Sequence, residues 1–373
     1  MRLHIFNPEH DIALAHNNPY FTAPHTGRQL RADLGFLPAL WAADGDWVLV
    51  DDVEAAHEHV RHLKNYAHKV VFVSTGDLKK FCSNASFCND SSSSRPPISI
   101  EPWGWNVALC HQLKIVGIPS RYLPSEQTLQ LIREMSGRQW AARNLIPMLP
   151  GMKEGTLSLP SIATSIEDLV KKYGDSTTTR VVLKAPWSSS GRGIRYVDGI
   201  LGSSLQGWIR RIISQQGCVM MEPYYDNKVK DFAVEFYAHS DGHITYEGLS
   251  LFKTMNGAYA GNIIMTEKEK RQLISHCVSL PVLENIISAI IRIMEPHIHF
   301  IYTGPFGVDM MALQGGIIHP CVELNLRRTM GHVALAISPH QSAPQRLMRI
   351  AYTDRYHLHI HDTFENIINN SII

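Results

Sequence analysis

Residues Gly304–His332 read GPFGVDMMALQGGIIHPCVELNLRRTMGH, and this stretch decides how the rest of the chain is interpreted. Alternating apolar residues predict a first strand at Phe306–Leu313 and a second strand at Ile317–Asn325. The segment between them, Gln314–Gly316, is rich in glycine and predicts a tight turn. The stretch is therefore expected to form a β-hairpin.

Three oxygen-bearing side chains of this hairpin suit a metal ion. Glu323 and Asn325 are two residues apart, so a strand places them on the same face. Asp309 stands in the facing strand. Carboxylate and amide oxygens are ligands that Mg²⁺ accepts, together with water and substrate phosphates. Alternatively the acids are solvated or paired with Arg327 and Arg328, and the hairpin alone does not decide between the two interpretations.

The turn length decides whether such a metal site can form. A two-residue loop would direct Asp309 and Glu323 to opposite faces, because a one-residue slip reverses every side chain. A three-residue turn pairs Leu313 with Ile317 and places Asp309 opposite Cys321, so that Glu323 becomes a diagonal neighbour on the same face. A shared metal site therefore predicts an odd-length turn or a compensating β-bulge.

Length and composition narrow the class of protein. A chain of 373 residues is expected to form two or three domains. With 45% hydrophobic and 18% charged residues it has the composition of a globular protein, and a net charge of +1 does not favour nucleic-acid or membrane binding. The N-terminus does not resemble a signal peptide, no apolar run is long enough to span a membrane, and the six cysteines are scattered without a CxxC pair. These features predict a cytoplasmic protein with reduced thiols.

A second informative stretch, Arg180–Asp198, reads RVVLKAPWSSSGRGIRYVD. It predicts a buried strand that ends at Lys184, a loop of small residues, and a returning strand at Ile194–Val197. Backbone N–H groups in such a loop can surround phosphate oxygens, and a neighbouring lysine adds positive charge. The GxxxxGK[ST] pattern is absent, and a flexible hairpin tip without a ligand is the alternative.

Two further polar clusters are weaker candidates. A short strand at Leu3–Phe6 is followed by polar residues at its carboxyl end, where open α/β sheets bind ligands, although turn and cap chemistry is the favoured explanation for them. These residues are Asn7, Glu9, His10 and Asp11. Near the C-terminus, alternate residues of an expected strand are histidines, but no acid or cysteine partner favours a metal site there. They are His357, His359 and His361.

Five segments occur in a fixed order along the chain. They are Lys184-Ala-Pro-Trp-Ser-Ser-Ser-Gly-Arg-Gly, Glu222-Pro-Tyr-Tyr, Asp231-Phe-Ala-Val-Glu, Gly307-Val-Asp309 and Glu323-Leu-Asn325-Leu-Arg327. This ordered set resembles the ATP-grasp superfamily, which includes D-alanine–D-alanine ligase, glutathione synthetase and biotin carboxylase. The resemblance covers Met135–Ser338 and implies an α/β fold, with an N-terminal parallel-sheet domain followed by a two-lobed α+β nucleotide-binding module. The expected divisions are 1–124, 125–240 and 241–373.

The resemblance also implies roles for individual residues. Lys184 and Arg138 would contact ATP phosphates, Glu222 and the backbone of Tyr224 would contact adenine, and Asp231 would contact ribose. The phosphate loop would comprise Ser188, Ser189, Ser190, Gly191 and Gly193. Two Mg²⁺ ions, or Mn²⁺ in their place, would be held by Asp309, Glu323 and Asn325. The catalytic residues acting on the transferring phosphoryl group would be Lys184, Arg327 and Arg328.

The implied activity is that of an ATP-dependent ligase. ATP would convert a small-molecule carboxylate into an acylphosphate, which an amine or a thiol then attacks. An ATP-binding protein without ligase activity and a small-molecule kinase remain alternatives, and a homodimer is neither required nor excluded. Replacing Lys184 with alanine is expected to weaken ATP binding and leave the fold intact, because the lysine is placed where a strand enters a loop.

Overall fold

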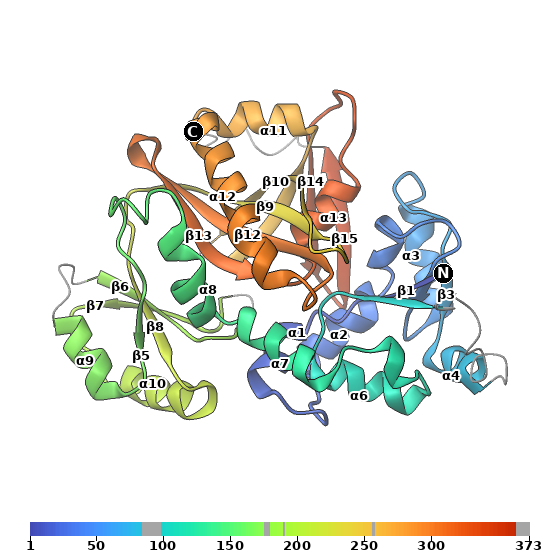
Figure 1. The fold of residues 1–373 in the computed structure, drawn as a ribbon. Coiled ribbons are helices and arrows are strands. Elements are labelled where there is room, and N and C mark those ends of the chain that lie inside the picture. The colour runs from blue at the N-terminus through green and yellow to red at the C-terminus, as the bar shows by residue number, and fades with distance from the viewer. Residues whose placement is uncertain (84–97, 175–179, 189–190, 256–257, 363–373) are drawn as a thin grey trace.

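The computed structural model describes residues 1–83, 98–174, 180–188, 191–255 and 258–362. The strands in these ranges form three sheets, which occupy separate parts of the molecule (Figure 1). The first sheet is parallel and the other two are antiparallel. The mixed α/β fold expected from the sequence, with an N-terminal parallel sheet, is therefore confirmed. No helix in the described ranges is both long and apolar enough to cross a membrane.

The N-terminal parallel sheet has the strand order β3-β2-β1-β4. Its strands are β1 (Arg2–Ile5), β2 (Trp47–Leu49), β3 (Val71–Val73) and β4 (Ser99–Pro102). Its helices are α1 (His10–His16), α2 (His25–Leu34), η1 (Leu37–Leu40), α3 (Val53–His62), α4 (Thr75–Ser83), α6 (Val107–Val116) and η2 (Ser120–Tyr122). Asp52 and Asn106 cap α3 and α6 by accepting from backbone N–H groups. Since β1 lies between β2 and β4, the segment after it opens at the carboxyl edge of the sheet.

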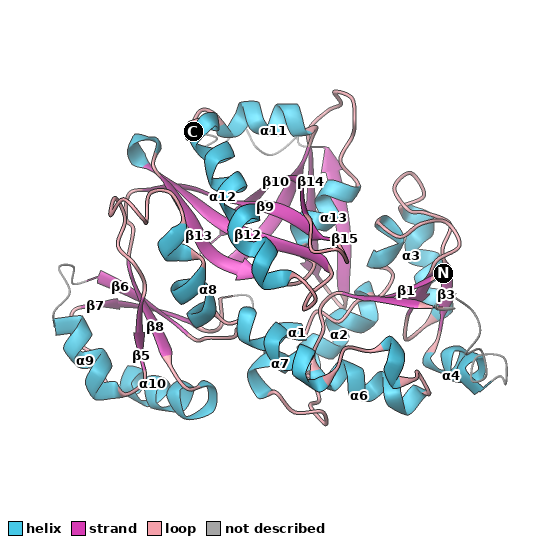
Figure 2. Cartoon of the chain, in the orientation of Figure 1, coloured by secondary structure: helices cyan, strands magenta, loops and turns pink. Residues whose placement is uncertain are grey.

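The small antiparallel sheet has the order β5-β8-β6-β7. Its strands are β5 (Ser161–Ala163), β6 (Arg180–Lys184), β7 (Ile194–Asp198) and β8 (Val219–Pro223). Helices α9 (Ile166–Gly174) and α10 (Ser203–Gln216) lie together on one side of it (Figure 2). Leu183 and Met221 pair across β6 and β8 and pack against these helices. Because side chains alternate along a strand, Lys184 and Glu222 lie on the opposite face.

The large antiparallel sheet has the order β13-β12-β9-β10-β11-β14-β15. Its strands are β9 (Lys228–Ala238), β10 (Ile244–Met255), β11 (Ala258–Ile264), β12 (Gly304–Leu313), β13 (Ile318–Asn325), β14 (Arg346–Tyr352) and β15 (Tyr356–Asp362). Its helices are α11 (Glu267–Ile274), α12 (Leu280–Ile298) and α13 (Met330–Ala336). Phe232, Phe236 and Phe306 are fully buried in the core that this sheet shares with α12. Val333 of α13 packs instead with Phe6 and joins the sheet to the N-terminal unit.

Helices α7 (Glu126–Met135) and α8 (Arg138–Asn144) and the turn η3 (Ile146–Met148) connect the N-terminal unit to the two antiparallel sheets. The expected division at residue 240 falls between β9 and β10, which are antiparallel partners within the large sheet. The chain changes sheets earlier, between β8 and β9. The division into 1–124, 125–240 and 241–373 thus stays a prediction, and the strand pairing favours an earlier second boundary.

Candidate active site

The turn between β12 and β13 has an odd length, as the sequence predicts. Gln314–Gly316 form a three-residue turn (η4), and the Leu313 N–H donates to the Ile317 carbonyl at 2.8 Å. Gly315 and Gly316 have φ angles of +78° and +77°, in a region where other residues are strained. The predicted pairing of Leu313 with Ile317 is confirmed.

A bulge then changes the register without changing the faces. Met311 pairs with His319, but Asp309 pairs directly with Glu323. One residue separates Asp309 from Met311 and three separate His319 from Glu323, so β13 carries two more residues than β12 in this interval. The predicted position of Asp309 opposite Cys321 is therefore wrong. Because the surplus is even, the predicted common face of Asp309 and Glu323 is confirmed.

The structure brings the three predicted metal-binding residues together. Asn325 Nδ2 donates to Asp309 Oδ2 at 3.1 Å, and Arg327 donates to Asn325 Oδ1 at 2.9 Å. Burial, and next the charge of Glu323, raise the pKa of Asp309 to about 7. Two neighbouring acids repel each other when both are ionised, and a cation between them removes this penalty. The oxygen set thus fits Mg²⁺, provided that Asn325 rotates to direct Oδ1 at the ion.

Arg138 links the metal-binding face to the phosphate loop. Its guanidinium donates to Glu323 Oε1 at 2.5 Å, to the Ala185 carbonyl at 2.6 Å and to Ser188 Oγ at 2.8 Å. Only 8% of Arg138 is exposed. A buried guanidinium with these three partners holds the entrance of the loop beside Glu323. Arg138 therefore joins the predicted phosphate loop to Glu323, and its contact with ATP phosphates stays a prediction.

Lys184 is paired within the site and is not a surface residue. Its Nζ donates to Glu222 Oε2 at 2.5 Å and to the carbonyl of Val322 in β13 at 3.3 Å. Lys184 is only 5% exposed. Removing the lysine would leave the largely buried Glu222 carboxylate without its cation, which is costly. The expectation that Lys184→Ala leaves the fold intact is therefore corrected: we expect this substitution to destabilise the protein.

The two consecutive arginines point to different places. Arg327 donates to both carboxylate oxygens of Asp11, at 2.9 and 2.8 Å, as well as to Asn325. Burial alone would raise the pKa of Asp11, but the charge of Arg327 and its hydrogen bonds outweigh burial and lower this pKa. Arg328 instead lies over the ring of Trp41 at 4.5 Å, and burial lowers its pKa to about 10. Only Arg327 is brought to the metal-binding residues.

The remaining predicted ATP contacts belong to both antiparallel sheets and to the loop between β6 and β7. The Tyr224 N–H already donates to the Arg180 carbonyl at 3.0 Å. Asp231 on β9 accepts from Lys228 at 2.8 Å and from Thr254 at 3.1 Å. Gly191 has a φ of +71°, and a side chain at Gly193 would collide with Ser188. Ser189 and Ser190 lie outside the described residues.

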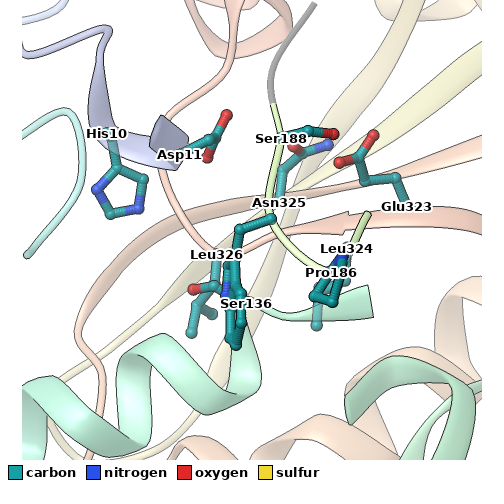
Figure 3. Close-up of a pocket in the computed structure, with 10 residues that line it drawn as sticks. His10, Asp11, Ser136, Pro186, Ser188, Glu323, Leu324, Asn325 and Leu326 are labelled. Carbon is teal, nitrogen blue, oxygen red and sulfur yellow. The ribbon is translucent and has the colours of Figure 1, made fainter. Parts of the chain in front are cut away.

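A pocket lies where the N-terminal unit meets this site (Figure 3). In Figure 3, His10 and Asp11 come from α1, Ser188 comes from the loop after β6, and Glu323 and Asn325 come from β13. The remaining lining residues are Ser136, Pro186, Trp187, Leu324 and Leu326. Two residues of the weak N-terminal candidate cluster are thus part of the site. Asn7 is not, because it bonds to the Gly104 backbone, and Glu9 pairs with Arg31.

The C-terminal histidines lie along β15 as expected, with the rings of His357 and His359 6.0 Å apart and those of His359 and His361 5.3 Å apart. Within the described part of the chain, no group of three or more His, Cys, Asp or Glu side chains is placed to hold a metal ion. The candidate metal-binding face of β12 and β13 is not such a group either, because it has only two carboxylates and its third member is an amide.

Sequence reasoning missed the part played by Glu235. This residue lies on β9 opposite Gly307 and is 1% exposed. Burial, and next the charge of Asp309, raise its pKa to about 8. A side chain at Gly307 or Gly331 would collide with the Glu235 carboxyl group. The sequence did contain a signal for this role. Glu235 is an acid in the middle of the apolar strand DFAVEF, and the chain has glycines at 307 and 331.

A hydrogen bond from Thr329 fixes one oxygen of the Glu235 carboxyl group. Thr329 Oγ1 donates to Glu235 Oε1 at 2.9 Å, and His332 Nδ1 lies 3.1 Å from Oε2. The same Nδ1 accepts the Thr329 N–H, and Nε2 faces the Phe236 carbonyl. His332 therefore carries its proton on Nε2, whereas Oε2 of Glu235 has no hydrogen-bond partner within the described residues. This network fixes the segment that follows Arg327.

Glu235→Gln is expected to make the protein less sensitive to alkaline pH. The native state keeps the Glu235 proton up to a pH of about 8, whereas the unfolded chain loses it near 4.5. The stability that this group contributes is thus present at low pH and is lost as the pH rises through that window, by an amount on the order of a few kcal/mol. Glutamine keeps an oxygen for the Thr329 hydroxyl but does not titrate. Urea unfolding at pH 5 and pH 8.5 measures how much the free energy of unfolding changes with pH. The control is Glu247→Gln, which removes an exposed carboxylate. Equal pH dependence of wild type and Glu235→Gln would contradict the prediction.

The chain matches no protein-family model and no curated protein. Among solved structures it is similar to N5-carboxyaminoimidazole synthetase from Staphylococcus aureus complexed with ADP, with 13% identity, a TM-score of 0.48, and coverage of 94% of this chain and 82% of that one. It is also similar to biotin carboxylase from Campylobacter jejuni, with 14% identity, a TM-score of 0.49 and coverage of 94% and 75%. A third is the biotin carboxylase domain of Hydrogenobacter thermophilus 2-oxoglutarate carboxylase, with 14% identity, a TM-score of 0.47 and coverage of 82% and 69%. Since each TM-score is below 0.5, the function proposed for this chain rests on its own residues.

Proposed function

We propose that this chain is an ATP-dependent ligase of the ATP-grasp type, which activates a carboxylate as an acylphosphate and joins it to an amine or a thiol. One observation carries the proposal: two acids and an amide on one face of β12 and β13 lie beside cations from three other elements. The residues concerned are Asp309, Glu323, Asn325, Arg138, Lys184 and Arg327. Such a set suits phosphoryl transfer, which depends on positioning and on neutralising phosphate charge.

The reaction has two steps. An oxygen of the substrate carboxylate attacks the γ-phosphorus of ATP, and the bond from that phosphorus to the β–γ bridging oxygen breaks, so that ADP leaves with the electron pair. The nitrogen of the amine then attacks the acyl carbon, the carbon–oxygen bond to phosphate breaks, and the amine proton passes to phosphate or solvent. Arg138 and Lys184 hold phosphate oxygens, and Arg327 orients the reacting groups.

Two Mg²⁺ ions bound by Asp309, Glu323 and Asn325, or Mn²⁺ in their place, would neutralise charge on the phosphates. Glu222 and the Tyr224 carbonyl are proposed to contact adenine, and Asp231 to contact ribose. Arg328, which lies over Trp41, is proposed to hold the N-terminal unit in place and not to contact the phosphoryl group. Small-molecule substrates and a cytoplasmic location belong to the same proposal.

Product analysis tests this function against its alternatives. The protein is incubated with ATP, Mg²⁺ and pooled carboxylic acids and amines, and the products are identified by mass spectrometry. A ligase releases ADP and phosphate and forms a product with the mass of acid plus amine less one water. A small-molecule kinase forms a phosphorylated product and no free phosphate. A protein that only binds ATP forms neither, and either of these last two outcomes would replace the proposed function.

ATP with Mg²⁺ is expected to protect the chain from trypsin at Arg192. This residue is exposed, and it lies between Gly191 and Gly193 in the proposed phosphate loop. Phosphate groups bound by the neighbouring backbone would make this bond less accessible to the protease. Mass spectrometry of a timed digest measures cleavage after Arg192, with the exposed Arg121 as the control site. Cleavage at an unchanged rate would contradict a role of this loop in ATP binding.

A further inference from the structure

His10 has a polar atom that no described residue satisfies. His10 is the first residue of α1, it lines the pocket, and it is only 1% exposed. Its Nε2 is buried and has no hydrogen-bond partner within the described ranges. An unsatisfied buried polar group costs about 1–3 kcal/mol, so such atoms are rare unless a ligand or a water completes them.

The neighbours of His10 show which nitrogen carries the proton. Asn106 Oδ1 accepts the Leu109 N–H at 2.9 Å as the cap of α6, so its Nδ2 is the atom that faces His10 Nδ1, at 3.3 Å. An amide N–H can only donate, and Nδ1 is therefore the acceptor. Burial lowers the pKa of His10 to about 4, so the ring is neutral and its proton is on Nε2.

The ring is also held in one orientation. A Cβ atom at Gly104 would lie 2.7 Å from His10 Nδ1 and Cε1, so the absence of a side chain there lets the ring pack on the backbone. Asn7 fixes that backbone by donating to the Gly104 carbonyl at 2.9 Å. The Nδ1 edge is enclosed in this way, and Nε2 is the ring nitrogen that remains without a partner in the described residues. His10 thus presents a rigid, uncharged donor.

An uncharged donor selects its ligand. An ammonium group or an amine that donates would set N–H against N–H and leave both unsatisfied, whereas an oxygen acceptor completes Nε2. The other polar groups around the pocket support the same choice, because Asp11 is already neutralised by Arg327, which lies within 2.9 Å of Asn325. His10 lines the same pocket as Glu323 and Asn325 (Figure 3).

We propose that His10 is a substrate-binding residue, whose Nε2–H donates to one oxygen of the carboxylate that is activated beside Glu323 and Asn325. The inference rests on the proposed ligase function and deepens it, since it assigns the pocket to the acid and not to the amine. The oxygen held by His10 is the one that stays in the carbonyl group, which leaves the second oxygen to face the phosphoryl group. Fixing one oxygen in this way selects which of two equivalent atoms reacts.

Acetate is the probe for this interaction, because every carboxylate presents the same two oxygens. Imidazole signals of ¹⁵N-histidine-labelled protein are recorded with saturating MgADP during an acetate titration, and the His10 signals are assigned by their loss in His10→Gln. We expect acetate to shift the His10 Nε2–H signal. Calorimetry of MgADP binding accompanies each sample. If MgADP does not bind, the proposed function fails and this inference fails with it; if MgADP binds and acetate leaves the His10 signal unmoved, the inference alone is overturned.

Two variants distinguish binding from a structural role. In His10→Gln the side-chain amide can place an N–H near the position of Nε2, whereas in His10→Asn it reaches only the position of Nδ1. We expect acetate affinity, measured by calorimetry with MgADP present, to fall about 10- to 100-fold in His10→Asn and to be largely kept in His10→Gln. MgADP affinity should stay unchanged in both, and the exposed His25→Asn is the matched control. Equal losses in the two His10 variants, or no loss in His10→Asn, would overturn the inference.

Discussion

Replacing Glu323 with glutamine is expected to abolish the Mg²⁺ dependence of ATP binding and to lower turnover about 10²- to 10³-fold or more. Glu323 is the carboxylate that joins the two halves of the site: it pairs with Asp309 across the hairpin and accepts from Arg138 at 2.5 Å. Glutamine has the same shape and keeps an oxygen for Arg138, but it loses the charge that a metal ion requires. The effect should therefore come from the ion and not from the fold.

Calorimetric titration of ATP with and without Mg²⁺ measures this prediction, and ADP release in the presence of pooled acids and amines measures turnover. The control is Glu58→Gln, which removes an exposed carboxylate from α3 in the N-terminal unit. Thermal unfolding of both variants shows whether the fold is kept. A Glu323→Gln protein that binds ATP more tightly with Mg²⁺ than without it, as the wild type should, would exclude Glu323 as a metal ligand.

The hairpin that carries this residue could be predicted from sequence because its rules are local. Side-chain alternation fixes which residues share a face, and the glycine pair fixes the turn. The bulge could not be predicted, although Pro320 lies within it and lacks the N–H that a regular ladder needs. The prediction of the common face of Asp309 and Glu323 survived because a two-residue surplus preserves alternation.

Contacts between distant parts of the chain were beyond such rules. Asp11 and Arg327 are 316 residues apart, and only the docking of the N-terminal unit on the large sheet brings them together. Similarly, β6 pairs with β8 as well as with its neighbour β7, which places Lys184 diagonally to Glu222. The sequence indicated both residues as ATP contacts and gave no sign that they bind each other. Sheet order depends on the whole chain, and no local pattern reports it.

Lys184→Met is expected to destabilise the protein by about 3–5 kcal/mol, because it leaves Glu222 as a largely buried charge without a partner. The exposed fractions of the two side chains are only 7% and 11%, so solvent screens their interaction little. Methionine fills the space of the lysine stem, which limits the effect of packing. As control, Lys172→Met breaks an ion pair with Asp168 whose side chains are 36% and 33% exposed. That change should cost no more than about 1 kcal/mol.

The double variant Lys184→Met, Glu222→Gln separates stability from ATP binding. It removes both charges, so urea unfolding should show that most of the lost stability returns. ATP affinity should nevertheless stay about 10- to 100-fold below that of Glu222→Gln alone, because phosphate oxygens lose a charged donor that no other residue replaces. Calorimetry on these two proteins isolates Lys184, since both lack the Glu222 charge. Equal ATP affinities would show that the lysine only stabilises the sheet, and the phosphate contact assigned to it would then be wrong.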